Sequence, residues 1–485
     1  MINFINADTI PGVIEHKPEH LAGRAPAARI GLLSLISADC DTVASMAQKA
    51  RQFQVDAFET LAALGFHVMR VSEITRTPEE AARHIRMLES AGAEALVMYV
   101  VDWSYSTTAA IGSLLNNGLP VVLWTNARPD CVGLVGMAIT KGGLDEVGID
   151  AAVVYGNFDD PATQDELKTL CTASAAARRL RGMRYGLGGT RSLEMLTSVV
   201  DPNQWLMKFG VDVSGFDELD VADRAQHIGA KEVDLYKKWL TSEFGAVEVD
   251  EIVVEMSVRL YLALKQVIAE NSFDFVSVKC LPVMPRIMTS FCLAHALLGD
   301  SSDAQGSKER TVCACESDSN GALTMQMMKN VSDQAINFAD VRWLDPQTGM
   351  LRISNCGSQA TELARSRKDV CWVKHGLQEI PWKHGGMCPQ CVSRPGRVTL
   401  ARLSRVKGRY VMLVAGGESL NIPREALKTT YWEFSPHTFV RVDAPALAFV
   451  KQLRSNHIHM MYGDWQRELV GLCQVLDIET VMPGV

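Results

Sequence analysis

The first half of the chain alternates short apolar runs with longer amphipathic segments, and this alternation restricts the fold more than any other feature. Branched and aromatic residues fill the runs, as in buried strands, and apolar side chains recur every three or four residues between them. Strand–helix alternation at this spacing predicts a parallel, doubly wound sheet. The predicted strands are residues 28–36, 66–72, 95–101 and 120–126, and the predicted helices include 41–65 and 105–117.

Polar residues follow several of these strands. Ser34, Asp102, Trp103 and the pair Thr125–Asn126 stand at or just beyond their carboxyl ends. Ligands of open parallel sheets bind beyond those ends. This edge is therefore a candidate ligand-binding edge of the first domain.

A second strand–helix alternation follows a predicted helix over 162–182. The strands begin at the glycine turn of MRYGLGGTRS and continue to residue 345. The turn lacks the third glycine of a dinucleotide fingerprint and the Lys-Ser/Thr of a P-loop, so a plain turn with close packing is favoured over a nucleotide site. The later predicted strands are 273–280, 312–316 and 336–345, and the predicted helices are 222–243, 248–271, 285–299 and 319–331.

The last third of the chain changes character. Residues 396–442 contain the short alternating runs RVTLARL, RYVMLVAGGE, TYWEFSP and TFVRVD, which predict antiparallel strands. Helices are expected near 444–454 and 464–476. The sequence thus predicts an α/β protein with two doubly wound parallel-sheet domains and a smaller C-terminal β-rich domain, over residues 1–175, 176–345 and 346–485.

Composition narrows the class of protein. Of 485 residues, 47% are hydrophobic, and 48 Lys and Arg stand against 56 Asp and Glu, for a net charge of −8. A mildly acidic chain without a basic stripe is a poor match for nucleic-acid phosphates or an anionic membrane surface. No apolar run reaches the roughly 18 residues of a spanning helix.

Residues 1–20 lack a basic stretch followed by an apolar one, so no secretory signal is predicted. The 12 cysteines are scattered, as in proteins of a reducing compartment. We therefore expect a cytoplasmic protein of several domains whose partner is a small molecule.

Three residues capable of chemistry stand out. Glu316 ends the predicted strand VCACE, and Asp340 ends INFAD one strand–helix–strand step later. This step predicts that both carboxylates lie at the carboxyl ends of neighbouring parallel strands and face one crevice. His457, in SNHIHMMYGDW after a predicted helix, is the third candidate.

Ordinary roles stay open for each of the three. Glu316 also suits a solvated or capping position, Asp340 also suits an ion pair with Arg342, and a lone histidine is often only hydrogen-bonded. If the three meet, two carboxylates and one imidazole with open positions suit Mn²⁺ or Mg²⁺. Zinc sites more often recruit sulfur or several histidines.

The segments CESDSNGALTMQMM, FADVRWLD and SNHIHMMYGDW occur in this order. They resemble the metal-binding segments of the L-fucose isomerase and L-arabinose isomerase superfamily, with the L-fucose isomerase branch nearer. Residues 192–213 and the segment ISNCGSQATELA resemble further parts of that family. The resemblance implies two α/β domains, a C-terminal β-rich domain, and assembly into a homo-oligomer, either a trimer or a hexamer.

The resemblance also implies roles for individual residues. Glu316, Asp340 and His457 would bind Mn²⁺, with Mg²⁺ or Co²⁺ as further options, and Glu316 and Asp340 would form the acid/base pair. Other residues would contact the sugar. These are Lys279 in the same crevice, Ser354 and Asn355 at sugar hydroxyls, and Trp103 by stacking, although simple packing explains Trp103 as well.

The implied activity is aldose–ketose isomerisation of a monosaccharide or a sugar derivative. A proton moves between C1 and C2 through an ene-diol, whose adjacent oxygens a divalent cation stabilises as a Lewis acid. The two carboxylates would transfer the protons. The sugar is left open between a pentose, a deoxyhexose and an anionic derivative.

Three further points stay open in the sequence. A non-catalytic cytoplasmic sugar sensor is compatible with the first domain, although it leaves the paired carboxylates unexplained. Cys388 and Cys391 form a CPQC motif that suits half a zinc site, a redox pair or two free thiols, and Cys356 and Cys371 are the nearest candidates to complete a zinc set. His459 is an alternative to His457 as ligand, and His375 and His384 are expected in surface loops.

Overall fold

The computed structural model divides the chain into two units, which are described separately. The described residues are 10–18, 27–39, 44–116, 118–377 and 380–484. The predicted start of the first helix, residues 41–43, lies outside them. The first unit consists of Met1–Arg179 and Val470–Asp477, and the second of Leu180–Leu469 and Ile478–Val485.

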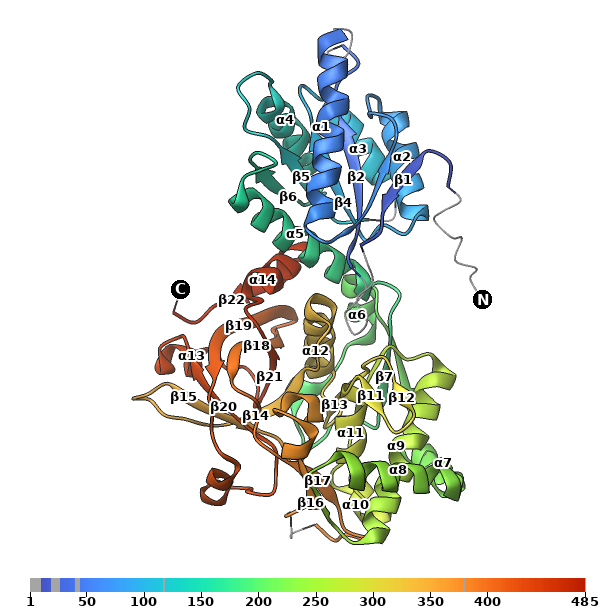
Figure 1. Ribbon diagram of the computed structural model, residues 1–485, viewed down its shortest axis with the longest axis vertical. Coiled ribbons are helices and arrows are strands. Elements are labelled where there is room, and N and C mark those ends of the chain that lie inside the picture. The colour runs from blue at the N-terminus through green and yellow to red at the C-terminus, as the bar shows by residue number, and fades with distance from the viewer. Residues whose placement is uncertain (1–9, 19–26, 40–43, 117, 378–379, 485) are drawn as a thin grey trace. The chain divides into compact units, whose positions relative to one another are not determined.

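A six-stranded sheet forms the centre of the first unit (Figure 1). Its order is β1-β3-β2-β4-β5-β6, and all pairs are parallel except the edge pair β1–β3. The four strands predicted here are confirmed, and β1 and β6 are two further ones. The bounds are β1 Val13–His16, β2 Arg29–Leu35, β3 His67–Val71, β4 Ala95–Val100, β5 Val121–Thr125 and β6 Ala151–Tyr155.

Helices cover both faces of this sheet, as the alternation predicted. One apolar core joins the strands to α1 and α5, and another joins them to α2, α3 and α4. Thr77 caps α2 through a capping box with Glu80, which explains why that helix begins at Pro78. The bounds are α1 Ala44–Ala63, α2 Pro78–Ser90, α3 Ser106–Leu114, α4 Gly133–Glu146 and α5 Pro161–Leu180.

The second unit contains a parallel sheet of order β13-β10-β7-β8. The apolar residues of α7, α8, α9 and α11 pack on one face, and Trp205 of α6 contacts the rings of Tyr185 and Phe275 from the other. The strands are β7 Arg184–Gly188, β8 Asp212–Phe216, β10 Phe275–Val278 and β13 Val312–Cys315. The helices are α6 Pro202–Phe209, α7 Glu218–His227, α8 Ala230–Glu243, α9 Glu251–Asn271, α10 Val283–Ile287, α11 Cys292–Gly299 and α12 Ser319–Ser332.

The glycines of β7 serve packing. A Cβ on Gly186 would lie 2.7 Å from the Phe273 ring, and one on Gly188 would lie 2.6 Å from the Phe216 ring. Gly189 has a φ of +82°, which favours glycine at the turn. These contacts account for the plain turn that the sequence favoured.

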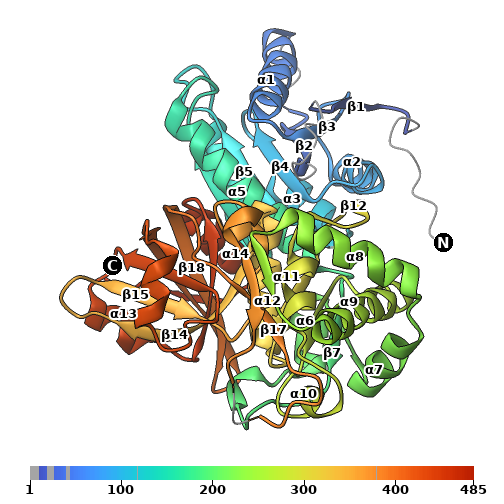
Figure 2. The ribbon, with the colours of Figure 1, turned by 60° about the horizontal axis from the view of Figure 1, so that its bottom comes forward.

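The β-rich part of the second unit closes on itself. Its strands run β18-β21-β14-β15-β20-β19-β22, and β18 also pairs with β19, so six antiparallel strands form a barrel with β22 added outside the ring. Figure 2 shows these strands from a second direction. The bounds are β14 Asn337–Leu344, β15 Met350–Ser354, β18 Gly396–Val406, β19 Arg409–Ser419, β20 His437–Val442, β21 His457–Tyr462 and β22 Glu479–Val481.

Three predictions for this unit are wrong. The strand 336–345 was expected in the parallel sheet, but β14 pairs with β15 and β21 instead. The run TYWEFSP forms turns rather than a strand. Residues 285–299 form two helices, α10 and α11, instead of one.

Smaller elements complete the unit. A three-stranded sheet joins β9 Ala246–Glu248, β16 Cys371–Lys374 and β17 Met387–Gln390. The two helices predicted near the carboxyl terminus are α13 Ala446–Gln452 and α14 Gln466–Val475, and α14 belongs to the first unit from Val470 on. The predicted domains 176–345 and 346–485 both contribute to this one unit, and their separation stays a prediction. No helix among the described residues combines the length and apolarity that crossing a bilayer requires.

Candidate metal centre

Glu316, Asp340 and His457 converge in the second unit. One ligand atom from each lies within 4.8 Å of the other two. The Nε2 atom of His457 is 3.3 Å from Glu316 Oε2 and 3.5 Å from Asp340 Oδ1. We call this group the carboxylate cluster. The structure thus joins the three residues that the sequence singled out.

Strand pairing places two members of the carboxylate cluster. Asp340 lies opposite His457 on β21 and opposite Ser354 on β15. Directly opposed residues point to the same face of a sheet. The neighbours Ala339 and Val341 pack into the barrel core, so Asp340 and His457 lie on the outer face. Asp340 was expected at the end of a parallel strand; it lies within an antiparallel one.

An unusual backbone conformation places Glu316. Glu316 and Ser317, between β13 and α12, both have a positive φ, of +60° and +48°. Such conformations are costly for residues other than glycine and collect at functional sites. The Ser317 N–H donates to Val278 O at 3.2 Å, and its hydroxyl donates to Gly188 O at 2.6 Å. The ends of β10 and β7 therefore hold this turn.

His457 is oriented by a carboxylate on its far side. Its Nδ1 lies 2.7 Å from Asp318 Oδ2, while Nε2 is buried and makes no hydrogen bond of acceptable geometry within the described part of the chain. Metal-binding histidines are commonly oriented in this way, with one nitrogen bonded to a carboxylate and the other facing the ion. The donor set therefore fits a divalent cation between His457, Glu316 and Asp340.

Charges around His457 are strongly coupled. Burial alone would lower the pKa of His457, but its hydrogen bond to Asp318 and the negative charges of Glu316 and Asp318 raise it to about 10. Burial would raise the pKa of Asp318, but the Arg402 guanidinium and His457 hold it far below its usual range. Arg402 Nη1 lies 2.5 Å from Asp318 Oδ2, and both side chains are buried. The site thus contains a buried ion pair behind its histidine.

Asp340 has three further partners. Asn456 Nδ2 donates to Asp340 Oδ1 at 2.9 Å, and Arg342 Nη2 donates to Oδ2 at 2.9 Å. Asn355 Nδ2 lies 3.4 Å from both Asp340 Oδ2 and Glu316 Oε1. The ion pair with Arg342 considered from the sequence is therefore present, and it coexists with the carboxylate cluster.

The other predicted sugar-contacting residues lie in different places. Ser354 is buried opposite Asp340. Lys279 follows β10 and opposes the effect of burial on Glu218, whose pKa burial raises to about 7. Trp103 belongs to the first unit, where its side chain is 38% exposed. Sugar contact by these residues stays a prediction.

Sequence reasoning missed Asp318 and Arg402. Asp318 is also the N-cap of α12, and its position three residues before Gly321 is the only signal for that role. His459, the alternative ligand, is not in the carboxylate cluster. Its Nε2 lies 3.3 Å from Arg402 Nη1.

The CPQC motif does not form a zinc pair among the described residues. Cys388 and Cys391 are buried and have different partners: the Cys391 sulfur accepts from Gln359 at 3.4 Å, and the Cys388 thiol donates to Phe434 O at 3.3 Å. All described cysteines are free thiols. The expectation of surface-loop histidines is wrong for His375, which is buried beside Cys292 and Cys356 because β16 and β17 bring it into the core.

Comparisons with known proteins point to one family of enzymes. Residues 36–182 match the first N-terminal domain of L-fucose isomerase, and residues 353–483 match its C-terminal domain. The chain is 24% identical to a sulfoquinovose isomerase of Alkalicoccus urumqiensis over 64% of this chain and 69% of that protein. It is also 24% identical to one of Clostridium sp. (strain MSTE9), over 74% and 80%. An L-fucose isomerase of Vibrio vulnificus is 23% identical over 79% of each chain.

Proposed function

The chain belongs to the L-fucose isomerase-like family of aldose–ketose isomerases, and we propose that its activity depends on a divalent cation at the carboxylate cluster. One observation carries this proposal. The buried Nε2 of His457 has no hydrogen bond within the described residues, yet it faces two carboxylates at 3.3 and 3.5 Å. A buried polar atom without a partner is costly, and a cation would relieve that cost.

Mn²⁺ is the proposed ion, with Mg²⁺ or Co²⁺ as further options, because two carboxylates and one imidazole leave positions open for substrate oxygens. When bound, the ion would stabilise negative charge on two adjacent sugar oxygens. Asp318 would keep the Nε2 lone pair of His457 directed at this position.

The chain's own carboxylates would transfer the protons. Glu316 and Asp340 face one space, so one is placed to take the proton from C2 and return it at C1, and the other to move the proton between the hydroxyl and the carbonyl oxygen. Asn355 lies within 3.4 Å of both carboxylates. It would hold them at a constant separation while the protons move.

Within the three substrate classes left open, we propose an anionic sugar derivative. Arg352 points from β15 to the same face as Ser354, and its buried Nε has no hydrogen-bond partner in the described chain. Burial and the charge of Arg342 lower the pKa of Arg352, so Arg352 lies close to a second cation, Arg342, which itself pairs with Asp340. A sulfonate or carboxylate on the sugar would relieve this repulsion. The relatives named sulfoquinovose isomerase agree with such a substrate.

Metal removal and solvent exchange test the isomerase together with its ion. The protein treated with EDTA should lose turnover on aldoses and ketoses, neutral and sulfonated, and regain it with Mn²⁺. Deuterium from D₂O should enter the sugar at C2 only when the ion is present. Retained turnover without metal would contradict the role of the cluster, and sugar binding without any exchange would favour the sensor alternative.

A single substitution tests the substrate class. Arg352→Ala should raise KM for the anionic sugar by roughly 10–100-fold, because a hydrogen bond to a charged group contributes about 1.5–3 kcal/mol. The KM for a neutral sugar should stay the same. Equal effects on both sugars would remove the anionic proposal. Assembly into a trimer or hexamer and a cytoplasmic location stay predictions from the sequence.

A further inference from the structure

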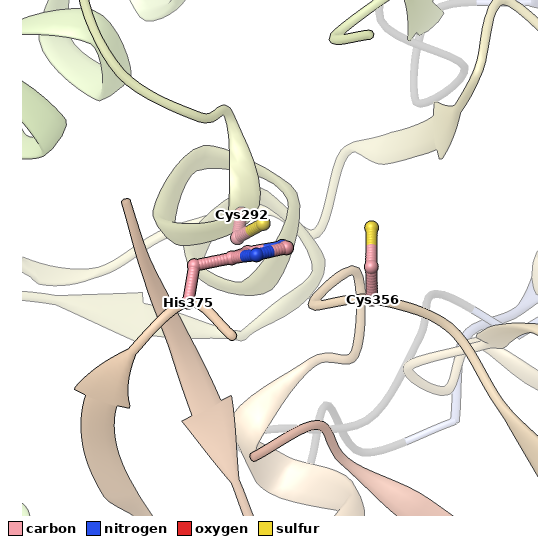
Figure 3. A group of neighbouring side chains, drawn as sticks. All are labelled: Cys292, Cys356 and His375. Carbon is pink, nitrogen blue, oxygen red and sulfur yellow. The ribbon is translucent and has the colours of Figure 1, made fainter. Parts of the chain in front are cut away.

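A second group of metal-type ligands lies apart from the carboxylate cluster. Figure 3 shows Cys292, Cys356 and His375, with the imidazole ring extending toward Cys356 and the Cys292 sulfur beside it. One ligand atom of each lies within 4.8 Å of the others. We call this group the thiol cluster. We propose that it is a structural zinc site, which goes beyond the proposed isomerase function.

The three side chains come from separate elements of the second unit. Cys292 begins α11, Cys356 follows β15, and His375 follows β16. Their exposed fractions are 3%, 6% and 4%. Bringing three ligands from distant positions to one buried point is what a structural ion does, because it links separate segments of the chain.

Two glycines let these segments approach. A Cβ on Gly357 would lie 2.5 Å from the Cys292 sulfur, so only glycine lets the segment after Cys356 reach α11. A Cβ on Gly386 would lie 3.1 Å from the His375 Cβ, and Gly386 O accepts from the His375 N–H at 2.8 Å. Glycine at these two positions therefore leaves the space in which Cys292 and His375 approach the neighbouring segments.

The donor chemistry selects the ion. Two sulfurs and one imidazole nitrogen suit zinc and exclude Mg²⁺ and Mn²⁺ as preferred ions. Three protein ligands leave a fourth position open, and Cys315, whose thiol influences Cys356 but lies outside the three-ligand group, is a candidate to fill it. Closed, four-ligand sites are typical of structural zinc. Burial argues against a reactive thiol, since reactive cysteines are at least partly exposed.

Zinc binding would require one particular tautomer of His375. The Leu377 N–H lies 3.3 Å from His375 Nδ1, so Nε2 is the nitrogen available to the sulfurs. Binding zinc through Nε2 places the ring proton on Nδ1, and the long contact with Leu377 then opens. The His375 tautomer is therefore a second readout of zinc binding.

The thiol cluster adjoins the proposed catalytic residues in the chain. Cys356 follows Asn355, and Cys315 precedes Glu316. Zinc at the thiol cluster would therefore fix the segments that carry Asn355 and Glu316. Its role is structural, and it touches no substrate.

Cobalt binding tests the proposal, with Co²⁺ alone as the probe on the full chain. The expected result is a thiolate-to-cobalt charge-transfer band that corresponds to one equivalent of Co²⁺, in addition to any Co²⁺ at the carboxylate cluster, whose oxygen and nitrogen ligands do not produce this band. The band should persist in Glu316→Gln, which separates this site from the carboxylate cluster. It should disappear in Cys292→Ser and in Cys356→Ser. A wild-type protein without the band overturns the proposal even if neither variant folds.

Cys313 supplies a matched control. It is a buried thiol on β13 whose sulfur lies 3.1 Å from His295 Nδ1, a Cys–His pair outside the thiol cluster. Cys313→Ser should keep the full band, and elemental analysis should find zinc in both wild type and this variant. If the band were lost in Cys313→Ser but kept in Cys356→Ser, the metal would lie at Cys313 and His295, and the proposal would be overturned.

Discussion

The carboxylate cluster and the thiol cluster lie in the same unit and adjoin in the chain, yet they are built differently. The first offers two carboxylates and one imidazole, and the second two thiols and one imidazole. The Asp340 side chain remains 13% exposed, whereas every member of the thiol cluster is buried. An open site with oxygen ligands suits catalysis, and a closed site with sulfur ligands suits structure.

The two histidines also have different neighbours, which are charged around His457 and uncharged around His375. His457 has a charged neighbour on each side, with Asp318 at Nδ1 and the carboxylates at Nε2. His375 has a backbone N–H at Nδ1 and packs against Trp382 and Phe434. The comparison teaches that ligand type alone does not define a site, because the residues behind the ligands decide its charge and its access.

The largest expected effect is a loss of turnover when a residue of the carboxylate cluster is changed, because only that cluster is proposed to take part in catalysis. Glu316→Gln keeps the shape of the side chain but removes its proton-transfer capacity, so kcat should fall by roughly 10²–10⁴-fold. Steady-state turnover with Mn²⁺ present measures this, and circular dichroism checks the fold. Glu309→Gln, in an exposed pair with Lys329, should keep wild-type turnover. Near-normal turnover of Glu316→Gln would make its acid/base assignment wrong.

The next effect concerns stability and the buried ion pair behind the carboxylate cluster. Arg402→Met leaves Asp318 buried without its cation, so the free energy of unfolding should fall by about 3–5 kcal/mol. Urea unfolding at neutral pH measures it. Arg397→Met breaks an exposed pair with Asp443 and should cost no more than about 1 kcal/mol. Equal losses in the two variants would show that burial does not distinguish these pairs.

Acid should act on the same ion pair. The folded-state pKa of Asp318 lies below its ordinary value, so its stabilising contribution is present above about pH 4 and is lost as the pH falls below that. The difference in unfolding free energy between wild type and Asp318→Asn should therefore shrink in acid. A constant difference down to about pH 3 would contradict this assignment.

How far the sequence predicts this site depends on where each residue lies. The alternation of strands and helices correctly predicted four strands of the first parallel sheet and β7, β10 and β13 of the second, because that signal is local, but it gave no strand at β8. It failed for Asp340, since β14 pairs with β15 and β21, and the choice between a parallel sheet and a barrel depends on strands far along the chain. The ordered motifs nevertheless grouped Glu316, Asp340 and His457, because their order does not depend on the sheet to which they belong.

The sequence did not predict residues whose partners come from a distant helix or strand. Arg402 lies two residues after Leu400 and opposite Leu413, on the face of β18 that forms the barrel core, where a charged side chain is not expected without a partner. It is only 2% exposed, and its partner Asp318 comes from the start of α12, far along the chain. The thiol cluster was missed for a related reason. The CPQC motif drew attention to neighbouring cysteines, whereas Cys292 and Cys356 meet only through the fold.

A pair of substitutions on one strand sharpens the assignment of the ligand. His457→Gln should weaken Mn²⁺ binding by about a hundredfold, because changing even a residue behind a ligand typically costs 10–100-fold. His459→Gln, two residues along on the same face of β21, should change Mn²⁺ affinity little. Calorimetric titration with Mn²⁺ measures both. If His459→Gln carried the loss instead, the ligand set would be wrong, and unchanged cobalt binding at the thiol cluster serves as the control.

The smallest effect concerns Asn355, which joins the two clusters in the chain. Its contacts to Glu316 and Asp340 are long, at 3.4 Å each, and a neutral hydrogen bond contributes about 0.5–1.5 kcal/mol. Asn355→Ala should therefore lower kcat by roughly two- to tenfold with KM unchanged, as measured by steady-state kinetics. Asn271→Ala, at a helix end, is the control. A loss confined to KM would show that Asn355 contacts the sugar itself, and a weaker cobalt site would show that it acts through Cys356.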